Sequence, residues 1–177
     1  MRIISGKHKG RRLIAPAKLP VRPTTDVAKE ALFNILNNYY HISDLKILDL
    51  FSGTGNISYE FAARGAQNIT AVDANFDCVK FIRKTAAELE FPITTIKSDV
   101  YKYLEKAPVK ADIIFADPPY DIEKDDFARI AKLVFENVLL EEDGLLIIEH
   151  SKHIDLSDLE RFRESRKYGS SVFSFFE

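Results

Sequence analysis

The chain has 177 residues, 46% of them apolar, and a formal net charge of −2 at pH 7. This length suits one domain, and its strand-sized apolar runs, with no apolar signal core at the start, exclude a membrane span and predict a cytoplasmic protein. The single cysteine, Cys78, excludes an internal disulfide, and the absence of any Cys/His cluster with ligand spacing predicts that no metal is bound.

The basic charge is concentrated at the N-terminus. The first 25 residues carry seven bases and no acid, whereas the remainder holds 18 bases and 27 acids. Apolar pairs at 3–4 and 13–14 flank Gly6 and Gly10, which predicts a short ordered β-hairpin. Such an arm on an acidic body is typical of nucleic-acid binding, and a solvated basic tail is the alternative. The candidate RNA-binding residues are Lys7, Lys9, Arg11, Arg12 and Arg22.

After a connector that ends near residue 24, helical and strand patterns alternate. Apolar residues at helical spacing, including Val27, with Thr24 or Thr25 as N-cap, predict a helix over 26–39. Strands are predicted at 46–50, 68–72, 93–97, 112–116 and 144–150, and helices at 56–64, 76–89, 100–106 and 125–137. This alternation predicts an α/β fold with a mostly parallel sheet and helices on both faces. Residues 159–168 and 171–176 flank Gly169 and predict an antiparallel edge hairpin, which completes seven strands.

The first strand runs into the segment DLFSGTG at 49–55, and a helix follows at once. Its two glycines allow a close approach of the backbone to a ligand. A dinucleotide fingerprint needs Gly or Ala where Ser58 stands, and the Lys-Ser/Thr of a P-loop is missing. Because Asp49 repels phosphate and attracts cations, the loop favours a sulfonium cofactor over NAD or ATP, although a plain βα turn also fits.

Two further predicted strands end in an acid. Asp73 follows Gly55 by eighteen residues, near the spacing at which an acid accepts hydrogen bonds from ribose hydroxyls. Asp99 follows the third strand and could accept from the exocyclic amine of an adenine. Either acid alone also fits a helix N-cap. Together with Asp49 and Asp117 they outline a groove for an adenosine that carries a cationic tail.

The segment Asp117-Pro118-Pro119-Tyr120 follows the fourth predicted strand. Two prolines fix φ and remove two backbone donors, so carbonyls are left without competing N–H groups. A carboxylate, a bare carbonyl and an aromatic face on one turn suit a flat group that carries an exocyclic amine, such as a nucleobase. An ordinary strand-ending turn is the alternative.

The combination of DLFSGTG, VD, SD and DPPY resembles the Rossmann-like class of S-adenosylmethionine-dependent methyltransferases that modify exocyclic amines. The stretches RIISGKHKGRRL and RPTTDVAKEALFNIL are similar to those of the RsmD-type family, which acts on guanine N2 of small-subunit (16S) ribosomal RNA. The resemblance implies a single methyltransferase domain over 1–177, with a basic hairpin arm and connector at 1–24 and a Rossmann-like core at 25–177. It also implies a monomer that binds S-adenosylmethionine and ribosomal RNA, within a small-subunit particle, and needs no metal.

The resemblance also implies residue roles. Gly53 and Gly55 would line the methionine moiety, Asp73 would hold the ribose and Asp99 the adenine amine. The segment 22–25 would help to close the cofactor pocket, residues 117–120 would hold the target base, and the basic hairpin would grip RNA. The implied cofactor-binding residues are Asp49, Phe51, Gly53, Gly55, Asp73, Asp99, Thr24 and Thr25, and the implied catalytic residues are Asp117, Pro118, Pro119 and Tyr120.

The sequence also fits other functions. A DNA or other RNA amino-methyltransferase, acting on adenine N6 or cytosine N4, would use the same turn but ordinarily needs a large target-recognition region. A protein-glutamine methyltransferase would more usually place Asn at position 117. A non-catalytic ribosome-assembly or RNA-binding factor could keep the same fold.

Residues outside these motifs are expected to have structural roles. We expect the histidines, including His150 at a strand end, on the surface or rim. Phe173, Phe175 and Phe176 are expected to pack in the core and at the sheet edge, and Cys78 to fill a core or half-buried position.

Overall fold

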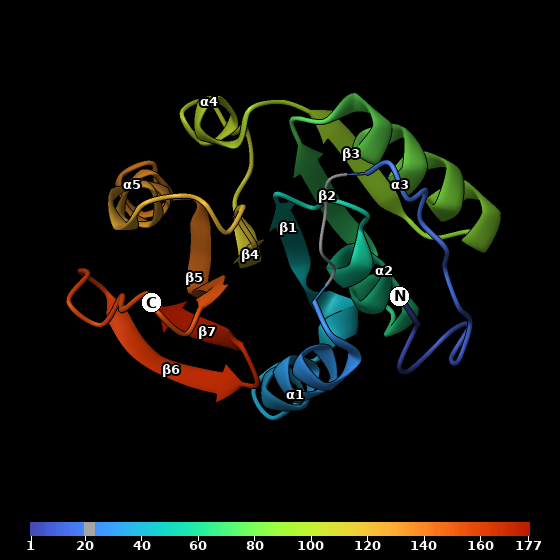
Figure 1. Cartoon of the computed structure of the whole chain (residues 1–177), viewed down its shortest axis with the longest axis horizontal. Helices are drawn as coiled ribbons and strands as arrows, with labels where there is room; N and C mark the ends of the chain where they lie inside the picture. The colour runs from blue at the N-terminus through green and yellow to red at the C-terminus, as the bar shows by residue number, and fades with distance from the viewer. Residues whose placement is uncertain (20–23) are drawn as a thin grey trace.

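The computed structural model describes residues 1–19 and 24–177. These residues form a seven-stranded sheet in the order β3-β2-β1-β4-β5-β7-β6 (Figure 1). Strands β1 to β5 pair in parallel, and β7 pairs antiparallel with both β5 and β6, which confirms the predicted mixed sheet. The strands are β1 Lys46–Leu50, β2 Asn68–Asp73, β3 Ile93–Lys97, β4 Ala111–Ala116, β5 Leu140–Ser151, β6 Phe162–Tyr168 and β7 Ser171–Phe176.

Helices cover both faces of the sheet. They are α1 Asp26–Asn37, α2 Asn56–Ala63, α3 Phe76–Leu89, α4 Val100–Leu104 and α5 Lys124–Glu136, with a 3-10 turn at Ile42–Asp44. Helices α1 to α3 pack on one face and α4 and α5 on the other (Figure 1). No helix in the described ranges has the length and apolar character that crossing a bilayer requires.

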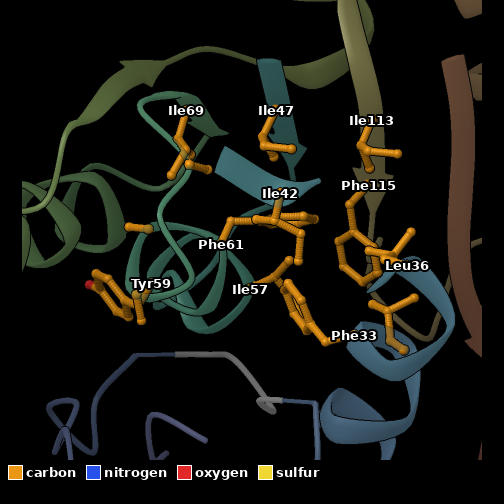
Figure 2. Packing of buried hydrophobic residues seen from close by; sticks show 14 of the residues in the cluster. Phe33, Leu36, Ile42, Ile47, Ile57, Tyr59, Phe61, Ile69, Ile113 and Phe115 are labelled. Carbon is orange, nitrogen blue, oxygen red and sulfur yellow. The ribbon is translucent and has the colours of Figure 1, made fainter. Parts of the chain in front are cut away.

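Alternating side chains of the strands supply the two hydrophobic clusters. Along β4, Ile113 and Phe115 face the helices α1 and α2, whereas Ile114 faces the opposite cluster. Figure 2 shows Phe33 of α1 and Phe61 of α2 on the same side as Phe115. The rings of Phe33 and Phe61 pack edge to face, with their centroids 4.6 Å apart. The predicted packing roles of Phe173, Phe175 and Phe176 are confirmed, since all three are buried.

Some local predictions were wrong. Helix α1, capped by Thr25, ends at Asn37, and Val27 is 73% exposed because the buried stripe starts at Ala28 and includes Lys29. Strand β5 begins four residues earlier than predicted, since it pairs with β4 on both sides of a register shift. His150 is buried rather than at the surface, and its Nε2 lies 2.7 Å from the Ser174 hydroxyl.

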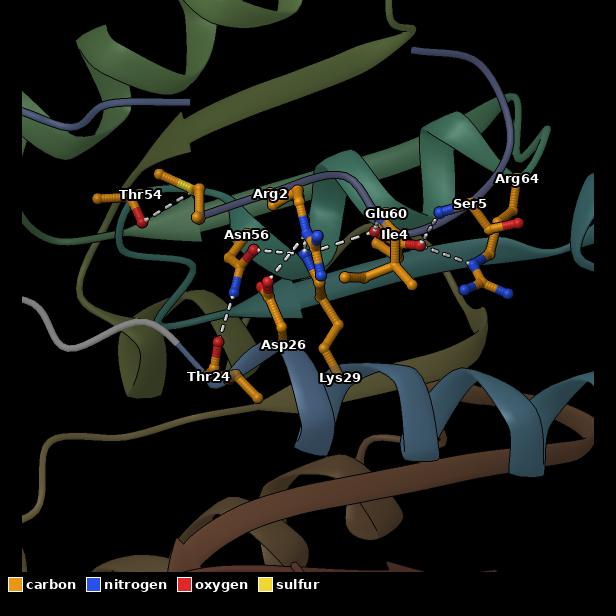
Figure 3. A network of polar contacts seen from close by, with 11 residues as sticks. Arg2, Ile4, Ser5, Thr24, Asp26, Lys29, Thr54, Asn56, Glu60 and Arg64 are labelled. Carbon is orange, nitrogen blue, oxygen red and sulfur yellow. Dashed lines mark hydrogen bonds and ion pairs between the residues drawn. The ribbon is translucent and has the colours of Figure 1, made fainter. Parts of the chain in front are cut away.

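A buried ionic cluster holds the N-terminal segment against α1 and α2 (Figure 3). The Glu60 carboxylate lies 3.4 Å from Lys29 Nζ and 2.9 Å from Arg64 Nε, and both Lys29 and Glu60 are buried. The same carboxylate accepts backbone hydrogen bonds from Ile4 and Ser5 at 2.9 and 3.1 Å. All these donors converge on one acid, so its charge is compensated inside the protein.

The predicted N-terminal hairpin is present as an antiparallel pairing packed on α2. Ile3 exchanges backbone hydrogen bonds with Arg11 and Gly10, and Arg2 and Arg12 form a β-bridge. At Gly6, where φ is +78°, a Cβ atom would lie 1.9 Å from the Ala63 carbonyl oxygen, so only glycine allows this approach. The segment is therefore an ordered part of the fold.

We predict that Glu60→Ala lowers the free energy of unfolding by about 3–5 kcal/mol, because it leaves Lys29 buried without a counter-charge. Urea denaturation measures the change. The control Glu136→Ala removes an exposed ion pair with Lys132 and should cost less than about 1 kcal/mol. A loss of the same small size in both variants would contradict the role assigned to the cluster.

Candidate active site

A cavity of about 460 Å³ opens at the carboxyl edge of the parallel strands. It is lined by residues in or after the last part of β1, β2 and β4 and by residues after β3, together with Thr24 ahead of α1. Thr25 and Gly55 are not among its lining residues. The lining residues that the sequence singled out are Thr24, Asp49, Phe51, Gly53, Asp73, Asp99, Asp117, Pro118, Pro119 and Tyr120.

The glycine-containing loop needs left-handed backbone at three positions. Phe51, Gly53 and Gly55 have φ values of 55°, 52° and 82°. Gly55 is the N-cap of α2, and a Cβ atom there would lie 2.9 Å from both Ile82 Cγ1 and Tyr59 Cζ. The close packing of α2 against α3 therefore requires Gly55, whereas Gly53 lines the cavity.

The acids after β2 and β3 also hold local structure. The Asp73 carboxylate accepts hydrogen bonds from the backbone N–H groups of Gly53 and Asn75, both at 2.8 Å, and so ties the glycine loop to the end of β2. Asp99 is exposed and caps α4 by accepting from the Lys102 N–H at 3.0 Å. Asp99 therefore combines a capping role with a position at the cavity.

Asp49 is only 2% exposed and lies at the cavity. Its carboxylate accepts a hydrogen bond of 2.5 Å from the Ser58 hydroxyl. Burial raises the pKa of Asp49 to about 7, and the hydrogen bonds from Ser58 oppose this shift. Ser58, which stands where a dinucleotide fingerprint needs Gly or Ala, therefore donates a hydrogen bond to Asp49.

Half-buried Asp117 and buried Glu149 extend this acidic group. Burial, followed by repulsion from Glu149 and Asp49, raises the pKa of Asp117 well above its ordinary value. Glu149 is 1% exposed, accepts a 2.6 Å hydrogen bond from the Thr24 hydroxyl, and has a pKa raised by burial. Within the described part of the chain, none of these three acids forms a salt bridge. We call Asp49, Asp117 and Glu149 the acidic triad.

The turn after β4 forms the outer wall of the cavity. Pro118 is buried, whereas Pro119 and Tyr120 are exposed, with Tyr120 at 51%. The Pro119 carbonyl accepts from the Ile122 N–H at 3.4 Å. The Pro118 carbonyl accepts no backbone hydrogen bond from residues 1–19 or 24–177.

Sequence reasoning missed two polar residues at this site. Glu149 stands near the end of β5, and the search for acids at strand ends that identified Asp73, Asp99 and Asp117 would have identified it too. Asn56 lines the cavity and donates to the Thr24 carbonyl at 2.9 Å while it accepts from Lys29 at 2.8 Å. No local sequence pattern marks Asn56, because its hydrogen-bond partners, Lys29 and Thr24, are distant in the sequence.

Of the candidate RNA-binding residues, Lys7, Lys9, Arg11 and Arg12 do not line the cavity, and Arg22 lies outside the described residues. Lys7, Lys9, Arg11 and Arg12 are exposed on the N-terminal hairpin. Lys7 pairs with Glu90 at 3.6 Å. Across the described ranges, no group of three His, Cys, Asp or Glu side chains could hold a metal ion.

Comparisons with known proteins cover the whole chain. The family model described as conserved hypothetical protein 95 matches residues 1–177. A Buchnera aphidicola protein named ribosomal RNA small subunit methyltransferase D is 30% identical over 156 residues, covering 88% of this chain and 78% of that protein.

Solved structures show the same fold. The Escherichia coli protein yhhF superposes with a TM-score of 0.85 at 26% identity, covering 99% of this chain and 96% of that one. The T. thermophilus 16S rRNA N2 G1207 methyltransferase, solved with AdoMet and guanosine, has a TM-score of 0.70 at 19% identity, covering 90% of this chain and 45% of that one. At this identity the second likeness concerns the fold alone.

The raised pKa of Asp49 predicts a pH effect on stability. The folded protein holds this proton more tightly than the unfolded chain, so the stabilisation is present at low pH and is lost as pH rises through about 7. Between pH 5 and pH 8, we expect the ligand-free protein to lose about 2 kcal/mol more unfolding free energy than Asp49→Asn, as measured by urea denaturation. Parallel pH profiles for the two proteins would contradict the pKa assigned to Asp49.

Proposed function

Because this chain belongs to the RsmD-type methyltransferase family, we propose that it transfers a methyl group from S-adenosylmethionine to the N2 amine of a guanine in 16S ribosomal RNA. One observation carries the proposal: the Asp117–Tyr120 turn and the glycine loop with its acids line the same cavity. Its volume of about 460 Å³ is in the range of small-molecule sites. The name of the Buchnera relative supports ribosomal RNA of the small subunit as substrate.

The carboxylates at the cavity fit this cofactor. When bound, S-adenosylmethionine supplies an electrophilic methyl group on a sulfonium. The acidic triad has no cationic partner among the described residues, and a ligand with sulfonium and ammonium charges would compensate it. In this proposal Asp73 accepts from the ribose hydroxyls and Asp99 from the adenine amine. Thr24, Phe51 and Gly53 complete the pocket walls, and Thr25 and Gly55 hold α1 and α2 in place.

The turn after β4 is proposed to hold the target base. The Asp117 carboxylate and the Pro118 carbonyl accept the two N–H groups of the amine, and Pro119 fixes the turn between them and Tyr120. Tyr120 stacks on the base, which contributes about 1–3 kcal/mol. The base has to leave its own stack to reach this turn.

Positioning supplies most of the proposed catalysis. The N2 lone pair of guanine is delocalised into the ring, so the amine attacks only when its hydrogens are held by acceptors that favour a pyramidal nitrogen. Hydrogen bonds to a charged acceptor are worth about 1.5–3 kcal/mol each, and alignment of the amine with the methyl group adds several more. A cation in the cavity favours ionised Asp117, which is the accepting form. The amine proton then leaves to Asp117 or to water.

The N-terminal hairpin is proposed to bind ribosomal RNA, with Lys7, Lys9, Arg11 and Arg12 contacting phosphates. This basic surface is exposed and held by the buried ionic cluster, so it presents its charges on an ordered backbone. We further propose a cytoplasmic, single-domain monomer whose substrate is RNA within a small-subunit particle.

The direct test is incubation of the purified protein with S-adenosylmethionine and small-subunit particles, followed by mass spectrometry of the nucleosides. The proposal predicts N2-methylguanosine. Methylated adenine or cytosine would contradict the proposed guanine specificity. Tight cofactor binding without methyl transfer to any RNA would indicate a non-catalytic RNA-binding factor.

We predict that Asp117→Ala lowers turnover by about a hundredfold or more, since it removes a charged acceptor from the transition state, and that it weakens S-adenosylmethionine binding far less, since Asp49 and Glu149 remain. Asp117→Asn should be less harmful, because its amide oxygen still accepts. Single-turnover methylation and calorimetry measure the two effects. Turnover close to that of the wild type in the alanine variant would contradict this mechanism.

We predict that Asp73→Ala weakens S-adenosylmethionine binding by about tenfold or more, because the ribose loses up to two charge-assisted hydrogen bonds and the Gly53 N–H loses its acceptor. Calorimetry measures the affinity. The control is Asp77→Ala, an exposed acid four residues further on that does not line the cavity. Equal affinities for both variants would refute the ribose role.

A further inference from the structure

The segment from His8 to Lys18 runs antiparallel along helix α3. At one end, the His8 ring lies 3.0 Å from the Leu89 carbonyl oxygen, near the last turn of the helix. At the other end, Lys18 Nζ lies 3.4 Å from Asp77, in the first turn. Between the two segments lies a second hollow of about 520 Å³, lined by Arg11 to Leu19 on one side and by Asp77 to Glu88 on the other. We call it the arm–α3 groove.

Positive charge lines both walls of the groove. Its bases are Arg11, Arg12, Lys18, Lys80 and Lys84, and its acids are Asp77 and Glu88. Lys84 pairs with Glu88 at 3.8 Å and Lys18 with Asp77, and all four side chains are largely exposed, so these pairs are weak. Within residues 1–19 and 24–177, the other three bases form no salt bridge. Their charge is left for a ligand.

The groove also offers apolar surface between its charges. Ile14 is 89% exposed on the arm side, and Phe81 is half-buried on the helix side. Lys80 and Lys84 stand one helical turn apart, about 5–6 Å between Cβ atoms, so they can contact successive phosphates of one strand. Cationic walls around apolar surface match the chemistry of single-stranded nucleic acid, in which bases and phosphates are both accessible.

The groove ends beside the cavity. Asp77 lines the groove, whereas Asn75 and Cys78, its neighbours in the first turn of α3, line the cavity. A strand that lies in the groove is therefore directed toward the edge of the candidate active site.

We propose that the arm–α3 groove binds the phosphate backbone of a single-stranded RNA segment that flanks the methylated nucleotide. This inference rests on the proposed function for the identity of the RNA. It adds Lys80 and Lys84 of α3 to the RNA-binding surface.

The test compares two double variants that remove the same charge. Lys80→Gln/Lys84→Gln alters the groove. Lys106→Gln/Lys132→Gln alters exposed lysines beside α4 and on α5, over the opposite face of the sheet, and Lys132 matches Lys84 because it pairs with Glu136 at 3.8 Å. Fluorescence anisotropy with a labelled 12-nucleotide oligouridine RNA measures affinity against salt concentration. Calorimetry with S-adenosylmethionine checks that the cavity is intact.

The groove variant should bind the RNA several-fold more weakly, and its log-log salt slope should fall by about 1.4, for two lost phosphate contacts. The control variant should bind like the wild type, and both variants should keep their cofactor affinity. Equal RNA binding by the two variants would overturn the inference, whether or not the protein methylates RNA. A groove-specific loss in a protein that transfers no methyl group would support the groove while refuting the proposed enzyme.

Discussion

The structure depends on how the parallel sheet gathers carboxylates at one edge. Strands β1, β4 and β5 are neighbours and run in the same direction, so the acids at their ends meet. Ala116 pairs with Ile148, which places Asp117 and Glu149 at the same level. Burial raises the pKa values of all three acids of the triad, and repulsion from Glu149 and Asp49 raises the pKa of Asp117 further, because ionised acids in a site of low polarity lack compensation. A cationic ligand relieves this cost, and a phosphate would increase it.

The buried ionic cluster at Glu60 differs from the acidic triad because it contains charges of both signs. The charge of Glu60 is compensated by Lys29 and Arg64, and this cluster fixes the N-terminal hairpin. Hydrogen bonds continue from Lys29 through Asn56 to the Thr24 carbonyl, and the Thr24 hydroxyl donates to Glu149. The compensated cluster thus sets the position of the hairpin and of the cavity wall, while the uncompensated triad is left to the ligand.

Local patterns in the sequence were enough to predict the strands, the helices and the acids that follow them. Each of these features depends on nearest neighbours along the chain, so periodicity and turn chemistry reveal it. Lys29 could not be placed in the same way: its charge predicts exposure, and only the fold brings Glu60 beside it. His150 was misplaced because the antiparallel hairpin, which brings Ser174 against it, covers that strand end. Asn56 was missed because its hydrogen-bond partners, Lys29 and Thr24, lie 27 and 32 residues away.

Compensation of the acidic triad by a cationic cofactor makes binding depend on protonation. Calorimetry of S-adenosylmethionine binding at pH 6.5, in buffers of different ionisation enthalpy, measures this dependence. Because Asp49 has a pKa of about 7 without ligand, part of the population is protonated at this pH. A bound cation should favour the ionised acids, so we expect net proton release on binding. A binding enthalpy independent of the buffer, or net proton uptake, would contradict it.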